Sequence, residues 1–277
     1  MQPPDQALLR LDPGGAGLDP DELKSCCASV YAHPAVRWLL GGELHPGGEQ
    51  ATRRALELIG LAGGDRLLDV ASGTGASALL AAREFEASVT GVDYGEQAVL
   101  AATAAAAAER LDDRVRFVPG DAEALALPDG SFDAVLCECS LCTFPDKPRA
   151  VAEMRRVLTP GGRVAIADVV IDPERLPGEL LGPIATVACV GSALTRSGYE
   201  ELLAHLGFEL SAVDDRTDDT VSFVERIQER LRGARLLGVD GFPGSPFGID
   251  EAIRLAGLAR EAIADGSIGY AIFAASR

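Results

Sequence analysis

The sequence predicts an α/β fold in which a mostly parallel sheet of seven strands is covered by helices on both faces. Two observations lead to this fold class. Short apolar segments alternate with helical segments along most of the chain, and this alternation is typical of parallel sheets. A glycine-rich turn, Gly73-Thr74-Gly75, also follows the first apolar segment directly, as in the first strand–helix connection of many doubly wound sheets.

Capping residues, breakers and apolar runs place the individual elements. The first helix is expected to begin after the capping residue Asp19, with Pro20 at its first position. Residues 1–18 before it are rich in proline and glycine, which predicts a loose arm. The expected helices cover residues 20–31, 35–40, 49–61, 76–84, 96–110, 147–158, 197–206, 221–231 and 249–264. The expected strands cover residues 66–70, 89–93, 115–118, 132–137, 163–170, 208–213 and 268–274, and the last of them is expected to close the sheet.

Composition and charge restrict the classes of partner. The chain has 277 residues with a net charge of -17, and a field of that sign repels nucleic acids and anionic membranes. No apolar run approaches the roughly 20 residues that span a bilayer, and the first ten residues lack the features of a signal peptide. We therefore expect a cytoplasmic protein that acts on a small molecule and binds neither nucleic acid nor membrane.

The turn after the first strand has the composition of a ligand-binding loop. It reads Asp69-Val70-Ala71-Ser72-Gly73-Thr74-Gly75, and with Ala78 it fits the dinucleotide pattern G-x-G-x-x-A. Glycines at these positions let the backbone turn tightly and approach a ligand closely. The pattern by itself does not distinguish a nicotinamide enzyme from a methyltransferase.

Three further segments make that distinction. Asp93 ends the second strand, where a carboxylate can accept hydrogen bonds from both ribose hydroxyls; Gly120-Asp121-Ala122-Glu123 follows the third strand; and Pro160-Gly161-Gly162 leads into the fifth. Together with the turn, these segments resemble the class I S-adenosylmethionine methyltransferases between about Gly63 and Val170.

The resemblance implies a Rossmann-like fold with S-adenosyl-L-methionine as cofactor. It places Asp69, Gly73 and Gly75 at the methionine end, Asp93 at the ribose and Asp121 at the adenine, with Tyr94 able to stack on the adenine. The expected cofactor-binding residues are Asp69, Ala71, Gly73, Gly75, Asp93, Tyr94, Asp121, Ala122 and Cys137. The expected divisions are an N-terminal helical lid over residues 1–62, a cofactor-binding core over 63–213, and a C-terminal helical insertion with the closing strand over 214–277.

Cysteines cluster where the acceptor is expected. Cys137-Glu138-Cys139-Ser140-Leu141-Cys142 lies at the end of the fourth strand, the edge of a parallel sheet that faces the ligand. This segment and Ala188-Cys189-Val190-Gly191-Ser192-Ala193-Leu194 resemble the arsenite methyltransferase family between about Asp69 and Phe208. The resemblance implies that Cys139 and Cys189 bind trivalent arsenic, a soft metalloid that prefers thiolate ligands.

The chain departs from that family at the third arsenic-binding thiol. The family has this cysteine in a loop just before the first strand, whereas the residues from Gly47 onward contain none there. We expect Cys26 or Cys27 on the first helix to replace it. Adjacent helical residues are about 100° apart, so only one of the two points inward, and Cys27 is slightly preferred. The alternative is that both pack, and glutathione or another small thiol completes the site.

Two other functions stay open. A methyltransferase for an oxygen, nitrogen or carbon atom of an organic metabolite needs a base for most acceptors, and His33, His45 and Glu138 are candidates that the sequence does not rank. A protein that binds a metal through Cys-x-Cys-x-x-Cys on a methyltransferase scaffold is the third possibility, although the cofactor acids argue against it.

Overall fold

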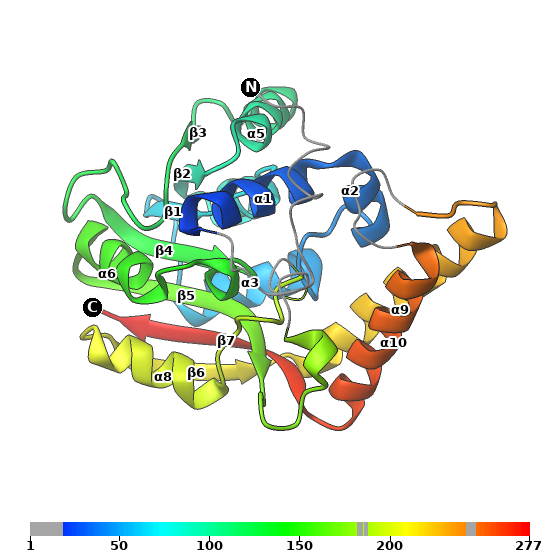
Figure 1. Ribbon diagram of the computed structural model, residues 1–277. Coiled ribbons are helices and arrows are strands. Elements are labelled where there is room, and N and C mark those ends of the chain that lie inside the picture. Colours follow the sequence, from blue (N-terminus) through cyan, green and yellow to red (C-terminus); the bar gives the residue numbers. More distant parts are fainter. Residues whose placement is uncertain (1–18, 182–184, 186–187, 242–247) are drawn as a thin grey trace.

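The computed structural model describes residues 19–181, 185, 188–241 and 248–277; the arm expected over residues 1–18 lies outside this range. The described chain forms one seven-stranded sheet with the order β3-β2-β1-β4-β5-β7-β6 (Figure 1). Neighbours from β3 through β5 pair in parallel, and β7 runs antiparallel to both β5 and β6. The predicted seven-stranded, mostly parallel sheet is thereby confirmed.

The strands and helices lie close to their predicted positions. The strands are β1 (Arg66–Val70), β2 (Ser88–Asp93), β3 (Val115–Pro119), β4 (Phe132–Glu138), β5 (Leu158–Ile171), β6 (Glu209–Asp215) and β7 (Ile268–Ser276). The α-helices bounded within the described residues are α1 (Pro20–Ala32), α2 (Pro34–Leu40), α3 (Gly48–Leu58), α4 (Ala76–Glu84), α5 (Glu96–Glu109), α6 (Lys147–Val157), α8 (Arg196–His205), α9 (Thr217–Leu236) and α10 (Ile249–Ala264). Within the described ranges, no helix is both long enough and apolar enough to span a membrane.

The last strand was expected to close the sheet, but it does not lie at the edge. β7 lies between β5 and β6, so β6 is the edge strand. All residues of β7 except the last are buried, whereas every residue of β6 is exposed or half-buried. The apolar β7 is stabilised most in the interior of the sheet, where both of its faces are buried. The more polar β6 can lie at the edge, where it contacts water.

Helices cover both faces of the sheet. Helices α3, α4, α5 and α10 contribute to one buried apolar cluster, and α6 and α8 contribute to the other. Buried alanines on α4 and α5 let these helices lie close to the sheet. This packing leaves the carboxyl ends of the parallel strands free of core helices.

Two helical pieces surround that edge of the sheet. Helix α1 begins as predicted: the Asp19 side chain accepts hydrogen bonds from the backbone of Asp21 and Glu22, and Pro20 is the first helical residue. Helices α9 and α10 pack side by side in the connection between β6 and β7 (Figure 1). Arg230 of α9 donates to the carbonyl oxygens of Trp38 and Leu39, at 2.8 and 3.1 Å, and so ties α9 to α2.

Candidate active site

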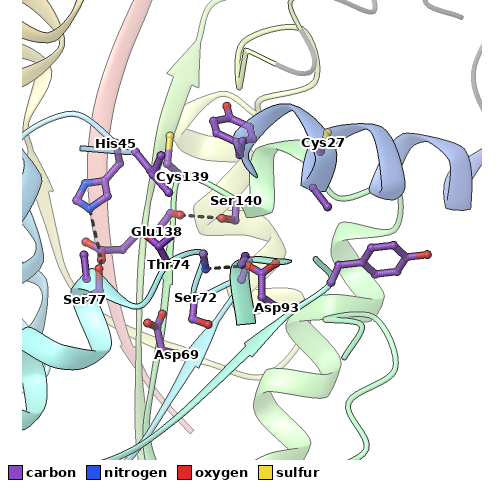
Figure 2. A pocket seen from close by; sticks show the side chains of 18 of the residues that line it. Cys27, His45, Asp69, Ser72, Thr74, Ser77, Asp93, Glu138, Cys139 and Ser140 are labelled. Atoms are coloured by element: carbon purple, nitrogen blue, oxygen red, sulfur yellow. Dashed lines mark hydrogen bonds and ion pairs between the residues drawn. The ribbon is translucent and has the colours of Figure 1, made fainter. Parts of the chain in front are cut away.

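A cavity of about 500 Å³ lies where the carboxyl ends of β1, β2 and β4 meet helix α1 (Figure 2). Ligands of open α/β sheets bind at this edge. All of the predicted cofactor-binding residues line the cavity except Gly75 and Cys137. The predicted residues that do so are Asp69, Ala71, Gly73, Asp93, Tyr94, Asp121 and Ala122.

The glycine-rich loop is shaped by residues with left-handed backbone. Gly73 has φ +53°, and its N–H donates to Oδ2 of Asp93 at 2.7 Å. Gly75 has φ +86°, and a Cβ there would lie 2.5 Å from Cζ of Phe117. Gly75 therefore serves the close packing of α4 against β3, whereas Gly73 shapes the cavity wall. Ala71 adopts φ 58°, which is uncommon for a residue other than glycine and is concentrated at functional sites.

Two carboxylates, the buried Asp69 and the half-buried Asp93, face this loop. Asp93 accepts hydrogen bonds from the backbone of Gly73 and of Gly95, at 2.7 and 2.8 Å. Burial raises the pKa of Asp93, and these two hydrogen bonds oppose the rise. Burial, with the nearby charges of Glu138 and Asp93, raises the pKa of Asp69 well above its ordinary value. A cationic or hydroxyl-bearing ligand would relieve this cost by supplying hydrogen-bond donors.

The polar atoms of the cavity fit the cofactor. Asp69 Oδ2, Ser72 Oγ and Glu138 Oε1 are buried without a hydrogen-bond partner, and each belongs to a residue that lines the cavity. Buried polar atoms are normally paired, so unpartnered atoms at a cavity indicate a ligand. S-adenosylmethionine carries an ammonium group and ribose hydroxyls that can donate to such oxygens.

Helix α1 covers the expected adenine end of the cavity. Lys24 Nζ lies 2.8 Å from Oδ2 of Asp121 and 2.5 Å from Oε2 of Glu123. Burial alone would lower the pKa of Lys24, but the bonds to these two carboxylates outweigh it and raise the pKa. The sequence did not single out Lys24, because its partners lie about a hundred positions further along the chain.

Cys139 and Cys189 come together across the end of β4. Strand β4 ends at Glu138, and Cys139 turns out of it with φ 47°; Cys189 has φ 65°. The Cys189 thiol donates to the carbonyl oxygen of Cys139 at 3.3 Å, and its sulfur lies 3.2 Å from the hydroxyl of Tyr31. The two cysteines that were expected to bind arsenic are therefore neighbours, and both have the left-handed backbone that non-glycine residues rarely adopt.

Cys137 does not lie beside Cys139, and its expected contact with the cofactor is wrong. It is fully buried in the apolar cluster beneath α6 and α8, on the other face of the sheet. Alternation along a regular strand would have put both thiols on one side, but Cys139 lies beyond the strand end.

Cys142 and Asp168 form a buried pair that was not predicted as part of the site. The backbone N–H of Cys142 donates to Oδ2 of Asp168 at 2.7 Å. Burial, followed by the nearby Cys189, raises the pKa of Asp168 to about 7. The only signal in the sequence was a single acid within the otherwise apolar run from Val164 to Ile171.

Cys27 of α1 lines the cavity (Figure 2), and Cys26 does not. Cys26 is buried in a small cluster with Val30. Burial, with the neighbouring Cys189 and Cys26, raises the pKa of Cys27 to about 12. Cys27 is thus the α1 thiol nearer the expected acceptor, although no three His, Cys, Asp or Glu residues in the described part of the chain are arranged to hold a metal ion.

A polar network occupies the wall next to Cys139. Ser77 Oγ and Thr52 Oγ1 donate to Oε2 of Glu138, at 2.6 and 3.1 Å. His45 Nε2 lies 3.8 Å from the same carboxylate oxygen (Figure 2). The third candidate base, His33, instead caps α2 by accepting from the backbone of Ala35 at 3.2 Å. The structure therefore separates His45 and Glu138, which line the cavity, from His33, which does not.

Comparisons with known proteins agree with this geometry. Residues 68–166 match the family model described as a methyltransferase domain. The chain is 31% identical to the 27-O-demethylrifamycin SV methyltransferase of Amycolatopsis mediterranei, covering 83% of this chain and 85% of that relative. It is 32% identical to an arsenite methyltransferase of Halobacterium salinarum, but over only 58% of this chain and 41% of that protein.

Solved structures share the whole fold. The cyclase SpnF aligns with a TM-score of 0.74 and 26% identity, covering 94% of this chain and 97% of that chain. Phosphoethanolamine N-methyltransferase 2 of Haemonchus contortus, solved with S-adenosyl-L-methionine, aligns with a TM-score of 0.76 and 23% identity, covering 95% of this chain and 60% of that chain. With the matching domain and the fitted cavity, these similarities establish that the chain belongs to the class I methyltransferases and uses S-adenosylmethionine.

Proposed function

We propose that this methyltransferase methylates a hydroxyl group of a small organic acceptor and that His45, held beside Glu138, accepts the proton of that hydroxyl. The observation that carries the proposal is the environment of the His45 ring. Its Nδ1 lies 3.1 Å from the carbonyl oxygen of Pro46, which can only accept, and this contact favours the tautomer with the proton on Nδ1. The lone pair is then on Nε2, on the side of the ring that faces Glu138.

The arrangement suits proton removal during methyl transfer. When bound, S-adenosylmethionine supplies an electrophilic methyl group on its sulfonium. The acceptor oxygen forms the new O–CH₃ bond as the S–CH₃ bond breaks, and the hydroxyl proton passes to Nε2 of His45. The Glu138 carboxylate, 3.8 Å away, stabilises the positive charge that the ring acquires. Ser77 and Thr52 hold that carboxylate in place.

The relatives support an oxygen acceptor. By its name, the relative from Amycolatopsis mediterranei acts on an oxygen of demethylrifamycin SV, and it matches this chain over most of its length. The arsenite methyltransferase matches a smaller part.

A thiophilic metalloid is the second candidate acceptor, and the meeting of thiols favours it. Cys139 and Cys189 are in contact, and Cys27 lines the same cavity as Cys139. Three thiolates would leave the lone pair of trivalent arsenic free to attack the methyl group, and no base would be required. In this candidate, Cys139 and Cys189 bind the metalloid, and Cys27 or an added small thiol such as glutathione completes the site.

One assay distinguishes the two candidates. Purified protein is incubated with S-adenosylmethionine carrying a tritiated methyl group and with either a panel of phenols and catechols or arsenite plus glutathione. We expect label in the organic products, loss of that activity in His45→Gln and its retention in Cys139→Ser and Cys189→Ser. Labelled methylarsenicals that disappear in the two Ser variants, with no labelled organic product, would replace the hydroxyl proposal by the metalloid one.

The two cysteines of α1 provide a matched pair for the metalloid candidate. If arsenic is the acceptor, Cys27→Ser should weaken arsenite binding, whereas Cys26→Ser should leave it unchanged because Cys26 packs away from the cavity. X-ray absorption at the arsenic edge counts the bound sulfurs. Equal behaviour of the two variants would exclude a ligand from α1.

A further inference from the structure

A second cavity, of about 360 Å³, lies on the other side of Cys139 from the cofactor acids. Its walls come from α1 and α2, from α9 and α10, and from the segment between β5 and α8. We call it the apolar chamber. Its described wall includes the aliphatic and aromatic side chains Val30, Val36, Leu39, Leu180, Phe223, Val224, Ile227, Leu255 and Ile263.

The apolar chamber adjoins the cofactor cavity. Tyr31, Leu44 and Cys139 line both spaces, so the two abut at these three residues. His45, the proposed base, directly follows Leu44 in the chain and lines the cofactor cavity. A molecule whose hydroxyl reaches His45 can therefore extend the rest of its structure past Cys139 into the chamber.

The chamber has almost no charge. Among its described wall residues, the acidic or basic ones are His33 and Glu179, and none is lysine or arginine. Burying an anionic group without a cationic partner is costly. The wall thus disfavours carboxylates, phosphates and diphosphates and favours uncharged hydrocarbon.

From these observations we infer that the acceptor has an uncharged, apolar body, such as a fused-ring or long-chain hydrocarbon portion, and that the apolar chamber holds it. This inference rests on the proposed methylation of an organic hydroxyl. It also assigns a role to the α9–α10 pair, which supplies much of the wall. Helix α10 turns Ala252, Ala256 and Ala259 toward the chamber, and these small side chains leave room for a ligand.

A binding experiment tests the chamber without turnover. The protein, saturated with S-adenosylhomocysteine, is titrated with the uncharged fluorescent probe N-phenyl-1-naphthylamine. We expect saturable binding that falls at least tenfold in Ala256→Phe, which fills the chamber, and does not change in Ala264→Phe, on the exposed end of the same helix. The anionic probe 1-anilinonaphthalene-8-sulfonate should bind at least tenfold more weakly. Equal probe binding by both variants, or no binding by the wild type, overturns the inference; S-adenosylhomocysteine affinity reports that each variant is folded.

A turnover series separates this inference from the proposed function. With 4-alkylcatechols from methyl to octyl, kcat/KM should rise about fourfold for each added methylene until the chamber is full. Ala256→Phe should shorten the optimal chain, and Ala264→Phe should not. Methylation that is independent of chain length keeps the proposed function and rejects the chamber as the site of the acceptor's body. Probe binding without methylation of any hydroxyl compound rejects the proposed function and leaves the chamber as a site for another apolar ligand.

Discussion

The two cavities that meet at Cys139 are lined by residues of opposite polarity. The cofactor cavity is lined by carboxylates, backbone N–H groups and a loop with left-handed residues, and several of its polar atoms lack partners. The apolar chamber is lined mainly by aliphatic side chains from helices. A ligand in the first is held by directed hydrogen bonds, whereas a ligand in the second is held by shape and by removal of apolar surface from water.

This difference predicts different responses to substitution. Directed hydrogen bonds fail when one partner is removed, because the other partner is left buried and unpaired. Apolar surface contributes in proportion to its area, so changes in the chamber should alter preference among acceptors by degrees. We therefore expect most substitutions of hydrogen-bonding residues in the cofactor cavity to abolish or strongly weaken ligand binding. Substitutions in the chamber should instead shift which acceptors are preferred. Substitutions at four positions test the polar side of this comparison. Three of these residues line the cofactor cavity, and the fourth, Asp168, is buried and accepts a hydrogen bond from Cys142.

The largest expected effect is on the chemical step. Replacing His45 by Gln removes the proposed base and should lower kcat about 10²- to 10⁴-fold for the best hydroxyl acceptor of the panel. The affinity for S-adenosylmethionine should change little. His205→Gln, on the exposed end of α8, is the matched control. A His45→Gln enzyme with normal kcat would show that the base lies elsewhere.

Cofactor affinity should depend next most strongly on Asp93. Asp93→Ala removes the expected acceptor of two ribose hydroxyl bonds and also the partner of Gly73 and Gly95. The loss should be on the order of 2 kcal/mol or more, which is about thirtyfold in Kd for S-adenosylmethionine. Calorimetry measures it, with the exposed Asp113→Ala as control. Wild-type affinity in Asp93→Ala would remove Asp93 from the cofactor site.

The buried Asp168 should make the stability of the folded protein depend on pH. Its pKa is about 7 in the folded protein, against an ordinary value of 3.8 for an aspartate in water, so the folded protein binds the proton more tightly than the unfolded chain does. This contribution is complete below about pH 4 and is lost as pH rises through 7. Asp168→Asn should therefore gain, relative to wild type, on the order of 4 kcal/mol between pH 4 and pH 8.

Urea unfolding at several pH values measures this difference. The Asn side chain keeps an oxygen that can accept from the backbone of Cys142, so the main effect is on the titration. Asp113→Asn, at an exposed position, should follow the wild-type curve. Parallel curves for wild type and Asp168→Asn would mean that the pKa of Asp168 is the same in the folded and unfolded states.

The smallest expected effect concerns the lid over the adenine end. Lys24→Met removes the cation that joins α1 to Asp121 and Glu123, and the affinity for S-adenosylmethionine should fall by about fivefold, mainly through faster dissociation. Lys24→Arg keeps the charge and should recover most of the loss. Stopped-flow displacement of the cofactor measures the rate. Unchanged dissociation in Lys24→Met would show that α1 is held in place by other contacts.

Local patterns determined much of this protein from sequence. The alternation of apolar and helical segments predicted β1, β2, β4, α4 and α10 to within a residue or so, because each pattern reflects a contact within the element or with one sheet face. The glycine loop and the acids Asp69, Asp93 and Asp121 were predicted from their positions at or just after the ends of successive strands. In parallel strands these ends meet at one edge, so order along the chain was sufficient to bring them together.

Only the tertiary structure determined the directions in which side chains point and the pairing of segments that are distant in the sequence. A single left-handed residue at Cys139 separates that thiol from Cys137, and no pattern in the sequence marks such a backbone change. The packing of α1 chose Cys27 over Cys26 for the cavity, and pairing with both β5 and β6 placed β7 inside the sheet. The apolar chamber joins residues from Val30 to Ile268, and its apolar side chains read in sequence as ordinary helix faces. A cavity is the space that packing leaves between segments, so the sequence determined its wall chemistry and only the fold determined that it exists.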